Sequence, residues 1–270
     1  MIAQKRLLYN FNKNGFSIVG VLTKKKIEFL KNKILQKILY VSKKNRIFSR
    51  IKELKDISYY HQISLKESEH QILMNSKDRY LKLSSDEVNM FNNTNIDTIF
   101  EYFYGNQAPL IKYPGKKLFR NNLVGFRIVR PGEKFVAGFH SESSYGIHCF
   151  TLWIPLTGAD HRYTLNIQPG SHLFRHRKDF IIQNKQFSTA KLFKKNYIKK
   201  LGPFLRPNLK LGEGIFFHPD LVHGGSENLG NKTRVSLEIR FYRKEIKNAE
   251  PQNREIIRKK RSKLINYSNF

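Results

Sequence analysis

The stretch Gly212–Tyr242, GEGIFFHPDLVHGGSENLGNKTRVSLEIRFY, contains the pattern that most strongly indicates the fold. A Gly-x-Gly turn introduces an apolar run, and residues 234–242 then alternate between polar and apolar side chains. Because side chains alternate across a β-strand, Arg234 and Ser236 share one face of the second strand, and its apolar side chains share the other. His223 lies between the two segments. The stretch therefore predicts two core strands with a histidine in their connection.

Short β-rich segments, punctuated by Gly and Pro, also occupy the chain before this stretch, from about residue 120 onward. Val, Ile, Phe and Tyr recur in these segments, as is typical of strands. The strands predicted in this half of the chain are 122–130, 134–140, 149–155, 163–168, 214–217 and 234–242. Strands at this spacing favour an antiparallel sheet that is closed or sandwiched, as in the jelly roll of cupin-like proteins.

The first part of the chain indicates a short strand followed by helices. Residues 15–20 predict the strand, and Thr23 is expected to cap a helix whose apolar residues recur at near-helical spacing. Ser84 and Glu87 have the spacing of a capping box. The expected fold class is therefore mainly β with α: a double-stranded β-helix (jelly roll, cupin-like) core with an N-terminal helical layer.

We expect a single domain over residues 1–270, because a chain of this length can bury a large core as one unit. Its predicted parts are a strand and helical part over 1–105, a jelly-roll core over 106–243 and a basic tail over 244–270. The basic segment 176–205 is predicted to form an insertion over the pocket mouth, where it would help to select the substrate.

A second group of polar signals lies in the segment His140-Ser141-Glu142. Residues i and i+2 of a strand point to one face, so His140 and Glu142 can reach one metal ion. His223 follows His140 by 83 positions (223 minus 140), so only the fold can bring it to the same ion. Two imidazoles and one carboxylate, with open coordination positions, are what a mononuclear non-haem Fe(II) centre requires. Arg234, shortly after His223, offers a bidentate fork for a carboxylate-bearing cosubstrate.

Other histidines compete for the role of metal ligand, because an H-x-E pattern alone is weakly specific. The alternatives are His148, His161, His172 and His176. His172 and His176 are four positions apart, a spacing that suits a metal pair on a helix. Arg175, Arg177 and Lys178 surround that pair, however, and cationic neighbours disfavour a bound cation.

Four motifs follow one another in an order that is more specific than any one of them. They are NGFSIV at 14–19 with Leu22-Thr23 and a helix, His140-Ser141-Glu142, LNIQPGSH at 165–172, and GEG at 212–214 through HGGSEN at 223–228 to Arg234-Val235-Ser236. Over roughly residues 14 to 242, the chain thereby resembles the phytanoyl-CoA hydroxylase-like branch of the Fe(II)/2-oxoglutarate dioxygenases. The commoner third ligand in that family is aspartate. Glu142 departs from it by one methylene, which changes the reach of the carboxylate but not its charge.

The resemblance implies roles for particular residues and a reaction. The Fe(II) ligands would be His140, Glu142 and His223. Arg234 would pair with the distal carboxylate of 2-oxoglutarate, Ser236 would hydrogen-bond it, and Thr151 falls where relatives place a cosubstrate-contacting hydroxyl. The implied reaction consumes O2, converts 2-oxoglutarate to succinate and CO2, and hydroxylates an unactivated carbon. A carboxylate at position 142 argues against halogenation, because a halide needs that coordination position.

The composition bounds the location and the partners of the protein. No run of eighteen apolar residues occurs, and the segment Met1–Arg6 lacks a signal peptide's apolar core, so we expect neither a transmembrane helix nor secretion. The single Cys149 excludes an internal disulfide and fits a reducing cytoplasm, the expected location. The formal net charge of +29 attracts nucleic acid, anionic membranes or phosphorylated substrates. The sequence has no ordered nucleic-acid-binding motif, however.

These observations leave several functions open. The predicted substrate is a small polar or anionic metabolite, such as a sugar, a lipid or a secondary-metabolite intermediate. One alternative is a non-catalytic jelly-roll protein that binds an anionic surface, and another is an oxygenase acting on nucleic acid or protein. The basic tail from Lys244 is either a solvated helix or a helix that contacts an anionic membrane surface.

Overall fold

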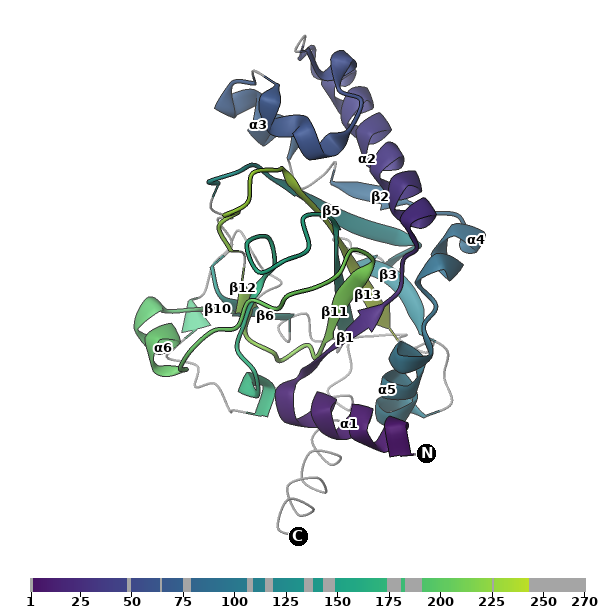
Figure 1. Ribbon diagram of the computed structural model, residues 1–270, viewed down its shortest axis with the longest axis vertical. Helices are drawn as coiled ribbons and strands as arrows, with labels where there is room; N and C mark the ends of the chain where they lie inside the picture. Colours follow the sequence, from purple (N-terminus) through teal and green to yellow (C-terminus); the bar gives the residue numbers. More distant parts are fainter. Residues whose placement is uncertain are drawn as a thin grey trace.

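The structure is a computed structural model, and it describes residues 2–47, 50–63, 65–74, 79–105, 109–114, 119–133, 138–142, 149–173, 181–182, 191–224 and 226–242. These residues form two antiparallel sheets, one of eight strands and one of five, with helices packed against the larger sheet. Figure 1 shows α2 and α3 at one end of the view, and α1 and α5 at the other. No helix among the described residues is long and apolar enough to cross a membrane.

The eight-stranded sheet is organised around its longest strand, β13. This strand pairs with β7 along one edge, and with β5 and then β3 along the other. The strands of this sheet are β1 (Phe16–Gly20), β2 (Tyr80–Lys82), β3 (Leu110–Pro114), β4 (Phe119–Asn121), β5 (Leu123–Val129), β7 (Phe150–Thr157), β11 (Glu213–Phe217) and β13 (Arg234–Tyr242). The central position of β13 places every inward-facing side chain of that strand between two neighbouring strands.

The five-stranded sheet is built from strands of two or three residues. In spatial order they are β8 (Asn166–Ile167), β12 (His223–Gly224), β6 (His140–Ser141), β10 (Lys191–Phe193) and β9 (Ile181–Ile182). The antiparallel pairing of β12 with β6 sets His223 directly opposite His140. The small sheet therefore joins two histidines that are distant in the sequence.

The two faces of the large sheet carry different side chains. On β13, Val235, Leu237, Ile239 and Phe241 belong to the main apolar cluster, which also contains the buried face of α2 and α5. The alternate residues of the strand point away from that cluster, as the two-residue period of a strand requires: Arg234, Ser236, Glu238 and Arg240. A second, smaller apolar cluster includes Trp153 of β7 and Phe217 of β11 together with Ile167 of the small sheet. The polar face of β13 thus lies on the side of the sheet that faces the small sheet.

The helical layer confirms two local predictions. Helix α2 (Lys24–Lys44) begins after Thr23, whose Oγ1 accepts a hydrogen bond from the Lys26 amide at 3.4 Å. The apolar residues at near-helical spacing, Ile27, Leu30, Ile34 and Ile38, form its buried stripe. Ser84 and Glu87 form the expected capping box at α4 (Ser85–Val88). The remaining helices and 3-10 turns are α1 (Ile2–Asn14), η1 (Arg50–Glu53), η2 (Ile57–Gln62), α3 (Glu67–Leu73), η3 (Asn89–Phe91), α5 (Thr94–Tyr104), η5 (Ser171–Leu173) and α6 (Lys195–Lys200).

Helix α1 was not predicted from the sequence, because it is stabilised by packing against distant parts of the chain. Phe11 is fully buried, and its ring lies 5.8 Å from that of Phe150 and 6.0 Å from that of Phe216. Phe103 of α5 also packs against Phe11, with the ring centroids 6.1 Å apart. The helix is therefore held by strands and a helix that are distant in the sequence, which a local pattern does not reveal.

The predicted fold class is confirmed, with corrections to its details. The jelly roll is sandwiched and its sheet is not closed. The strand predicted over 163–168 is shortened to Asn166–Ile167, because the Tyr163 and Thr164 amides bond back to the Asp160 carbonyl in a turn. Part of the predicted insertion 176–205 extends the small sheet, since β10 pairs with β6. Residues 134–137 of a predicted strand, residues 176–180 and 183–190 of the insertion, and the tail 244–270 lie outside the described residues.

Candidate metal centre

The predicted triad converges at one point of the small sheet. His140 lies in β6, Glu142 follows that strand directly, and His223 lies in β12, the neighbouring strand in Figure 1. The Oε1 atom of Glu142 is 3.6 Å from Nε2 of His140 and 3.6 Å from Nε2 of His223. Within the described part of the chain, these are the residues whose ligand atoms could hold a metal, and the atoms all lie within 4.8 Å of one another.

Hydrogen bonds fix the orientation of both imidazole rings. Nδ1 of His140 lies 2.9 Å from the Gly138 carbonyl, and Nδ1 of His223 lies 3.0 Å from the Leu221 carbonyl. A carbonyl only accepts, so each Nδ1 carries the proton and donates it, and each neutral ring presents the Nε2 lone pair. Metal-ligating histidines are commonly oriented by such a bond from the other ring nitrogen.

The electrostatics of the triad favour an ionised carboxylate between two imidazoles. Burial alone would raise the pKa of Glu142, but Arg240 and the two histidines hold it well below its usual range. Burial and the nearby His140 lower the pKa of His223. Burial would also lower the pKa of His140, yet the contact with Glu142 outweighs it and raises that pKa. Two nitrogen donors and one anionic oxygen form a donor set that suits Fe(II).

Arg234 is fixed from one side by its own chain. It is 2% exposed, and its Nη1 donates to the Tyr163 carbonyl at 2.9 Å and to the Ser226 carbonyl at 3.2 Å. Its Nε is buried and has no hydrogen-bond partner among the described residues. Burial and the charge of Arg206 lower the pKa of Arg234 to about 10, so the group remains cationic at neutral pH. A buried cation with an unused donor is chemically suited to a ligand carboxylate.

Ser236 and Thr151, the two residues predicted to bind the cosubstrate together with Arg234, lie at different places on the polar face of the large sheet. Ser236 is 1% exposed and faces Pro155 of β7 and Arg127 of β5 as strand partners. Thr151 is the strand partner of Arg240, at the other end of β13 from Arg234. Its buried Oγ1 has no partner within the described ranges. Two unsatisfied polar atoms, on Arg234 and Thr151, therefore lie on the face that also carries Arg240, the partner of the triad carboxylate.

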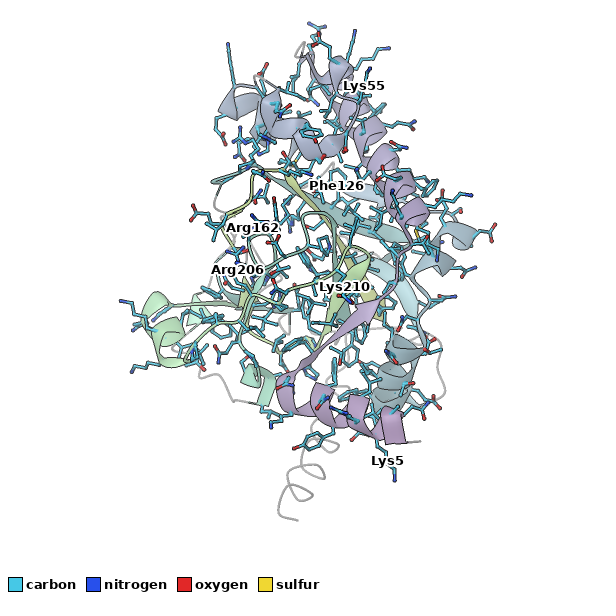
Figure 2. All side chains as sticks on the ribbon, viewed as in Figure 1. Lys5, Lys55, Phe126, Arg162, Arg206 and Lys210 are labelled. Atoms are coloured by element: carbon cyan, nitrogen blue, oxygen red, sulfur yellow. The ribbon has the colours of Figure 1, made fainter. Side chains whose placement is uncertain are left out.

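Several site residues were not identified from the sequence. Arg240 donates to Glu142 Oε2 at 2.7 Å and also pairs with Glu238. The alternation along β13 places Arg240 on the face of Arg234 and Ser236, so that period was an available signal. Arg206 carried no such signal. It donates to the Arg162 carbonyl at 2.7 Å, and Figure 2 shows these two arginines close together.

The competing histidines do not join the triad. His172 Nε2 bonds the Asn12 carbonyl at 2.9 Å, and its ring packs against His218. His161 contacts the Asn208 side chain at 3.1 Å. His148 and His176 lie outside the described residues, so the predicted helical pair of His172 with His176 also falls there.

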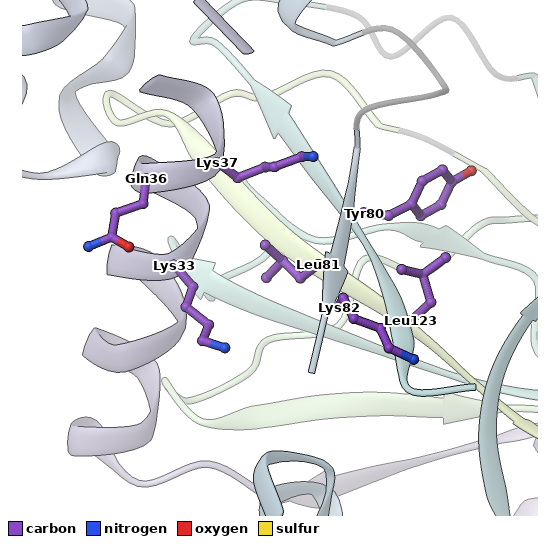
Figure 3. A pocket seen from close by; sticks show the side chains of 7 residues that line it. All are labelled: Lys33, Gln36, Lys37, Tyr80, Leu81, Lys82 and Leu123. Carbon is purple, nitrogen blue, oxygen red and sulfur yellow. The ribbon is translucent and has the colours of Figure 1, made fainter. Parts of the chain in front are cut away.

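A separate hollow of about 500 Å³ lies between α2, β2 and β5. Figure 3 shows the side chains that line it: Lys33, Gln36, Lys37, Tyr80, Leu81, Lys82 and Leu123. Two of its lysines already have partners, because Lys33 pairs with Glu87 at 2.6 Å and Lys82 bonds the Asn121 carbonyl. This hollow contains none of the triad residues.

A jelly roll in which two histidines and a carboxylate converge defines the class of non-haem iron oxygenases. The family model described as "Phytanoyl-CoA dioxygenase (PhyH)" matches residues 11–236, most of the chain. The chain therefore belongs to the phytanoyl-CoA dioxygenase family, and it is an Fe(II)- and 2-oxoglutarate-dependent oxygenase. The predicted family resemblance is thereby confirmed.

Solved structures show the same fold at low sequence identity. The epimerase SnoN, crystallised with Fe3+, alpha ketoglutarate and nogalamycin RO, matches with a TM-score of 0.54 and 18% identity over 90% of this chain and 84% of its own. The alpha ketoglutarate dependent carbocyclase SnoK gives 0.55 and 15%, over 88% and 83%. Apo EctD from S. alaskensis gives 0.55 and 12%, over 88% and 76%. A comparison with curated proteins gives no match.

Proposed function

We propose that His140, Glu142 and His223 bind Fe(II) and that the protein hydroxylates a small polar or anionic metabolite at that centre. The observation that carries the proposal is the convergence of two Nε2 atoms on one carboxylate oxygen, each at 3.6 Å, with both Nδ1 atoms tied to backbone carbonyls. Such an arrangement leaves three lone pairs aimed at one point.

Arg234, Ser236 and Thr151 are proposed to bind the cosubstrate 2-oxoglutarate. The unpaired Nε of Arg234 and the unpaired hydroxyl of Thr151 support this assignment, because buried polar atoms are normally satisfied, by a ligand if not by the protein. Bound iron would supply the activation of O2 that is coupled to decarboxylation of 2-oxoglutarate.

The protein's own residues contribute positioning and electrostatics. The carbonyls of Gly138 and Leu221 accept the Nδ1 protons and thereby keep each Nε2 turned toward the metal position. The Tyr163 and Ser226 carbonyls hold Arg234 so that its remaining edge can receive a carboxylate. Phe217, whose ring lies 4.5 Å from that of His223, limits the access of water on that side.

The preference for an anionic substrate rests on the charges near the site. Arg206 and Arg127 both lie close enough to Arg234 to lower its pKa. The Nε of Arg206 is buried without a partner in the described part of the chain. One dianionic cosubstrate satisfies Arg234, and Arg127 pairs with Glu238, so Arg206 is the cation that favours a second anionic group. The net charge of +29 would attract the same substrates from solution.

We also propose that the protein is a single domain and that it is cytoplasmic. The helical layer and the large sheet share one continuous apolar cluster, which supports a single folding unit over both. The free, buried Cys149 suits a reducing cytoplasm.

The test is anaerobic Fe(II) binding followed by turnover. Wild type should bind one Fe(II), and it should form succinate from 2-oxoglutarate once O2 is admitted. His223→Ala should lose most of its iron and its succinate production, whereas His161→Ala, a histidine away from the triad, should retain both. A screen of phosphorylated, carboxylated and neutral metabolites would then identify the substrate class by stimulated succinate formation. Full iron occupancy in both His140→Ala and His223→Ala would refute the triad. Absence of iron and succinate in wild type would favour the non-catalytic binding protein.

A further inference from the structure

The carboxylate of Glu142 is held by both of its oxygens, and each oxygen has a different neighbour. Oε1 faces the Nε2 atoms of His140 and His223, each at 3.6 Å. Oε2 accepts a hydrogen bond from Nη1 of Arg240 at 2.7 Å. The backbone of Glu142 is fixed as well, because its amide donates to the Pro219 carbonyl at 2.8 Å. Only one carboxylate oxygen is thus directed at the point where the two imidazoles meet.

Arg240 is in turn held by the large sheet. Its side chain is 3% exposed, and its Nε donates to Glu238 Oε1 at 3.0 Å. Glu238 also lies 3.6 Å from Nη2 of Arg127 on β5. The four side chains form a row of alternating charge, from Arg127 through Glu238 and Arg240 to Glu142. Because Glu142 follows a strand of the small sheet, this row connects the two sheets at the triad.

This row of charges limits how many coordination positions of a bound metal the Glu142 carboxylate can occupy. Six positions are typical of octahedral Fe(II), and two histidines with one carboxylate oxygen use three of them. A cosubstrate that chelates through two oxygens and an O2 molecule need the other three. A glutamate that bound through both oxygens would occupy one of these. The longer side chain of glutamate has an extra rotatable bond compared with aspartate, so its orientation needs an additional constraint.

We propose that Arg240 is a positioning residue that holds Oε2 of Glu142, so that this carboxylate binds the metal through Oε1 alone and leaves a coordination position open. The inference rests on the proposed function, since it assumes that the triad binds Fe(II). It assigns no contact between Arg240 and the substrate. Glu238 supports Arg240 by engaging the Nε edge of the guanidinium, which leaves Nη1 for Glu142.

The test compares Arg240→Ala with wild type, Arg240→Lys and a matched control. Arg130→Gln is the control, because Arg130 also joins two carboxylates, Glu67 and Glu133, without contacting the triad. Fe(II) is titrated anaerobically into each full-length protein, 2-oxoglutarate is then added, and the metal-to-ligand charge-transfer absorbance is recorded. The d–d spectrum of the Co(II)-loaded proteins reports the coordination number independently of turnover.

In Arg240→Ala we expect Fe(II) to stay bound while the charge-transfer band shifts and the Kd for 2-oxoglutarate rises. Loss of an outer partner of a metal ligand typically costs about 10–100-fold in metal affinity or activity, and we expect a rise of about tenfold in the Kd for 2-oxoglutarate here. Arg240→Lys should recover part of the affinity, because an ammonium can still hold Oε2. If Arg240→Ala does not fold, Arg240→Met, which has no hydrogen-bond donor, replaces it, and the same spectral shift and rise in Kd are expected.

Identical spectra and 2-oxoglutarate affinity in Arg240→Ala, Arg130→Gln and wild type would overturn the inference and leave the triad intact. A fall in thermal stability without a spectral shift would also overturn it, because Arg240 would then be a structural ion-pair partner only. Absence of Fe(II) binding in wild type would instead refute the proposed function itself.

Discussion

Replacement of Arg234 by alanine should abolish measurable 2-oxoglutarate binding while iron remains bound. The guanidinium is 2% exposed, and its Nη1 is committed to the Tyr163 and Ser226 carbonyls. These bonds fix the plane of the group, and the buried Nε on its other edge has no partner among the described residues. With its pKa lowered by burial and by Arg206 only to about 10, the side chain is charged at neutral pH. It therefore presents a preoriented cation to a ligand carboxylate.

The expected loss follows from this burial. Removing one partner of a buried ion pair costs about 3–5 kcal/mol, because the other charge stays buried and unpaired. At about 1.4 kcal/mol per decade, that is more than a hundredfold in affinity. Arg234→Lys should bind weakly, since lysine keeps the charge but cannot reproduce the planar fork.

The assay is an anaerobic titration of 2-oxoglutarate into the Fe(II) protein, followed by its metal-to-ligand charge-transfer absorbance. Arg162→Ala is the control, because Arg162 lies near this region but forms an exposed pair with Asp160 at 2.8 Å, and such pairs contribute little. Iron content and thermal unfolding are measured on the same samples, since Arg234→Ala also leaves two backbone carbonyls without their donor. Equal 2-oxoglutarate affinity in wild type and Arg234→Ala would refute the cosubstrate assignment.

Four further outcomes are expected. Ser236→Ala should weaken 2-oxoglutarate binding by about 1 kcal/mol, the value of one hydrogen bond, and an unchanged Kd in the same titration would remove Ser236 from the site. Iron retention, measured after desalting, should fall as the pH drops from 7 to about 5, because protons compete with iron for imidazoles with a reference pKa near 6.5. The raised pKa of His140 makes this competition begin at higher pH. Constant retention over this range would contradict a two-histidine site. Phe150→Ala should lower the free energy of unfolding by about 3–5 kcal/mol in a denaturant titration, because the fully buried ring packs against Phe11, Phe103 and Phe216; a loss below about 1 kcal/mol would show that the core collapses around it. Saturating Fe(II) at about 100 times its Kd should stabilise wild type by about 2.7 kcal/mol and His223→Ala much less, and an equal thermal shift in both would indicate binding elsewhere.

The sequence predicts those features that depend on local periodicity. The alternation of β13 correctly separates the Arg234 face from the Leu237 face, and the position of Thr23 correctly marks the start of α2. The H-x-E pattern and the order of motifs were sufficient to select His140, Glu142 and His223 as a group, which the register of β6 with β12 brings together. Whether these residues bind iron stays a prediction.

Features that depend on contacts between distant segments could not be predicted. The Arg240–Glu142 pair joins residues separated by 98 positions, and its existence depends on how the two sheets face one another. The position of Thr151 opposite Arg240 depends on a register that shifts at a bulge between Val235 and Ser236, because continuing the pairing of Val235 with Thr157 without that shift would place Thr151 opposite Phe241. A one-residue shift of this kind changes which side chains become neighbours, and no local pattern near Thr151 indicates it.

One face of β13 packs in the apolar core, and the other face carries the polar residues of the candidate site. This separation explains why so much charge can be buried in one strand. On one face, Leu237 and Ile239 are fully buried in an apolar cluster that extends into the helices. On the other face, Arg234 and Arg240 each lie at 3% exposure or less, which is costly for a cation without a partner. The positive charge of Arg240 is compensated by the carboxylates of Glu142 and Glu238. Arg234 has only neutral acceptors among the described residues, so its burial is best compensated when an anionic ligand is bound. We therefore propose that the cosubstrate binds at the Arg234 end of the strand, whereas at the other end Arg240 is already paired with Glu142, the carboxylate of the triad.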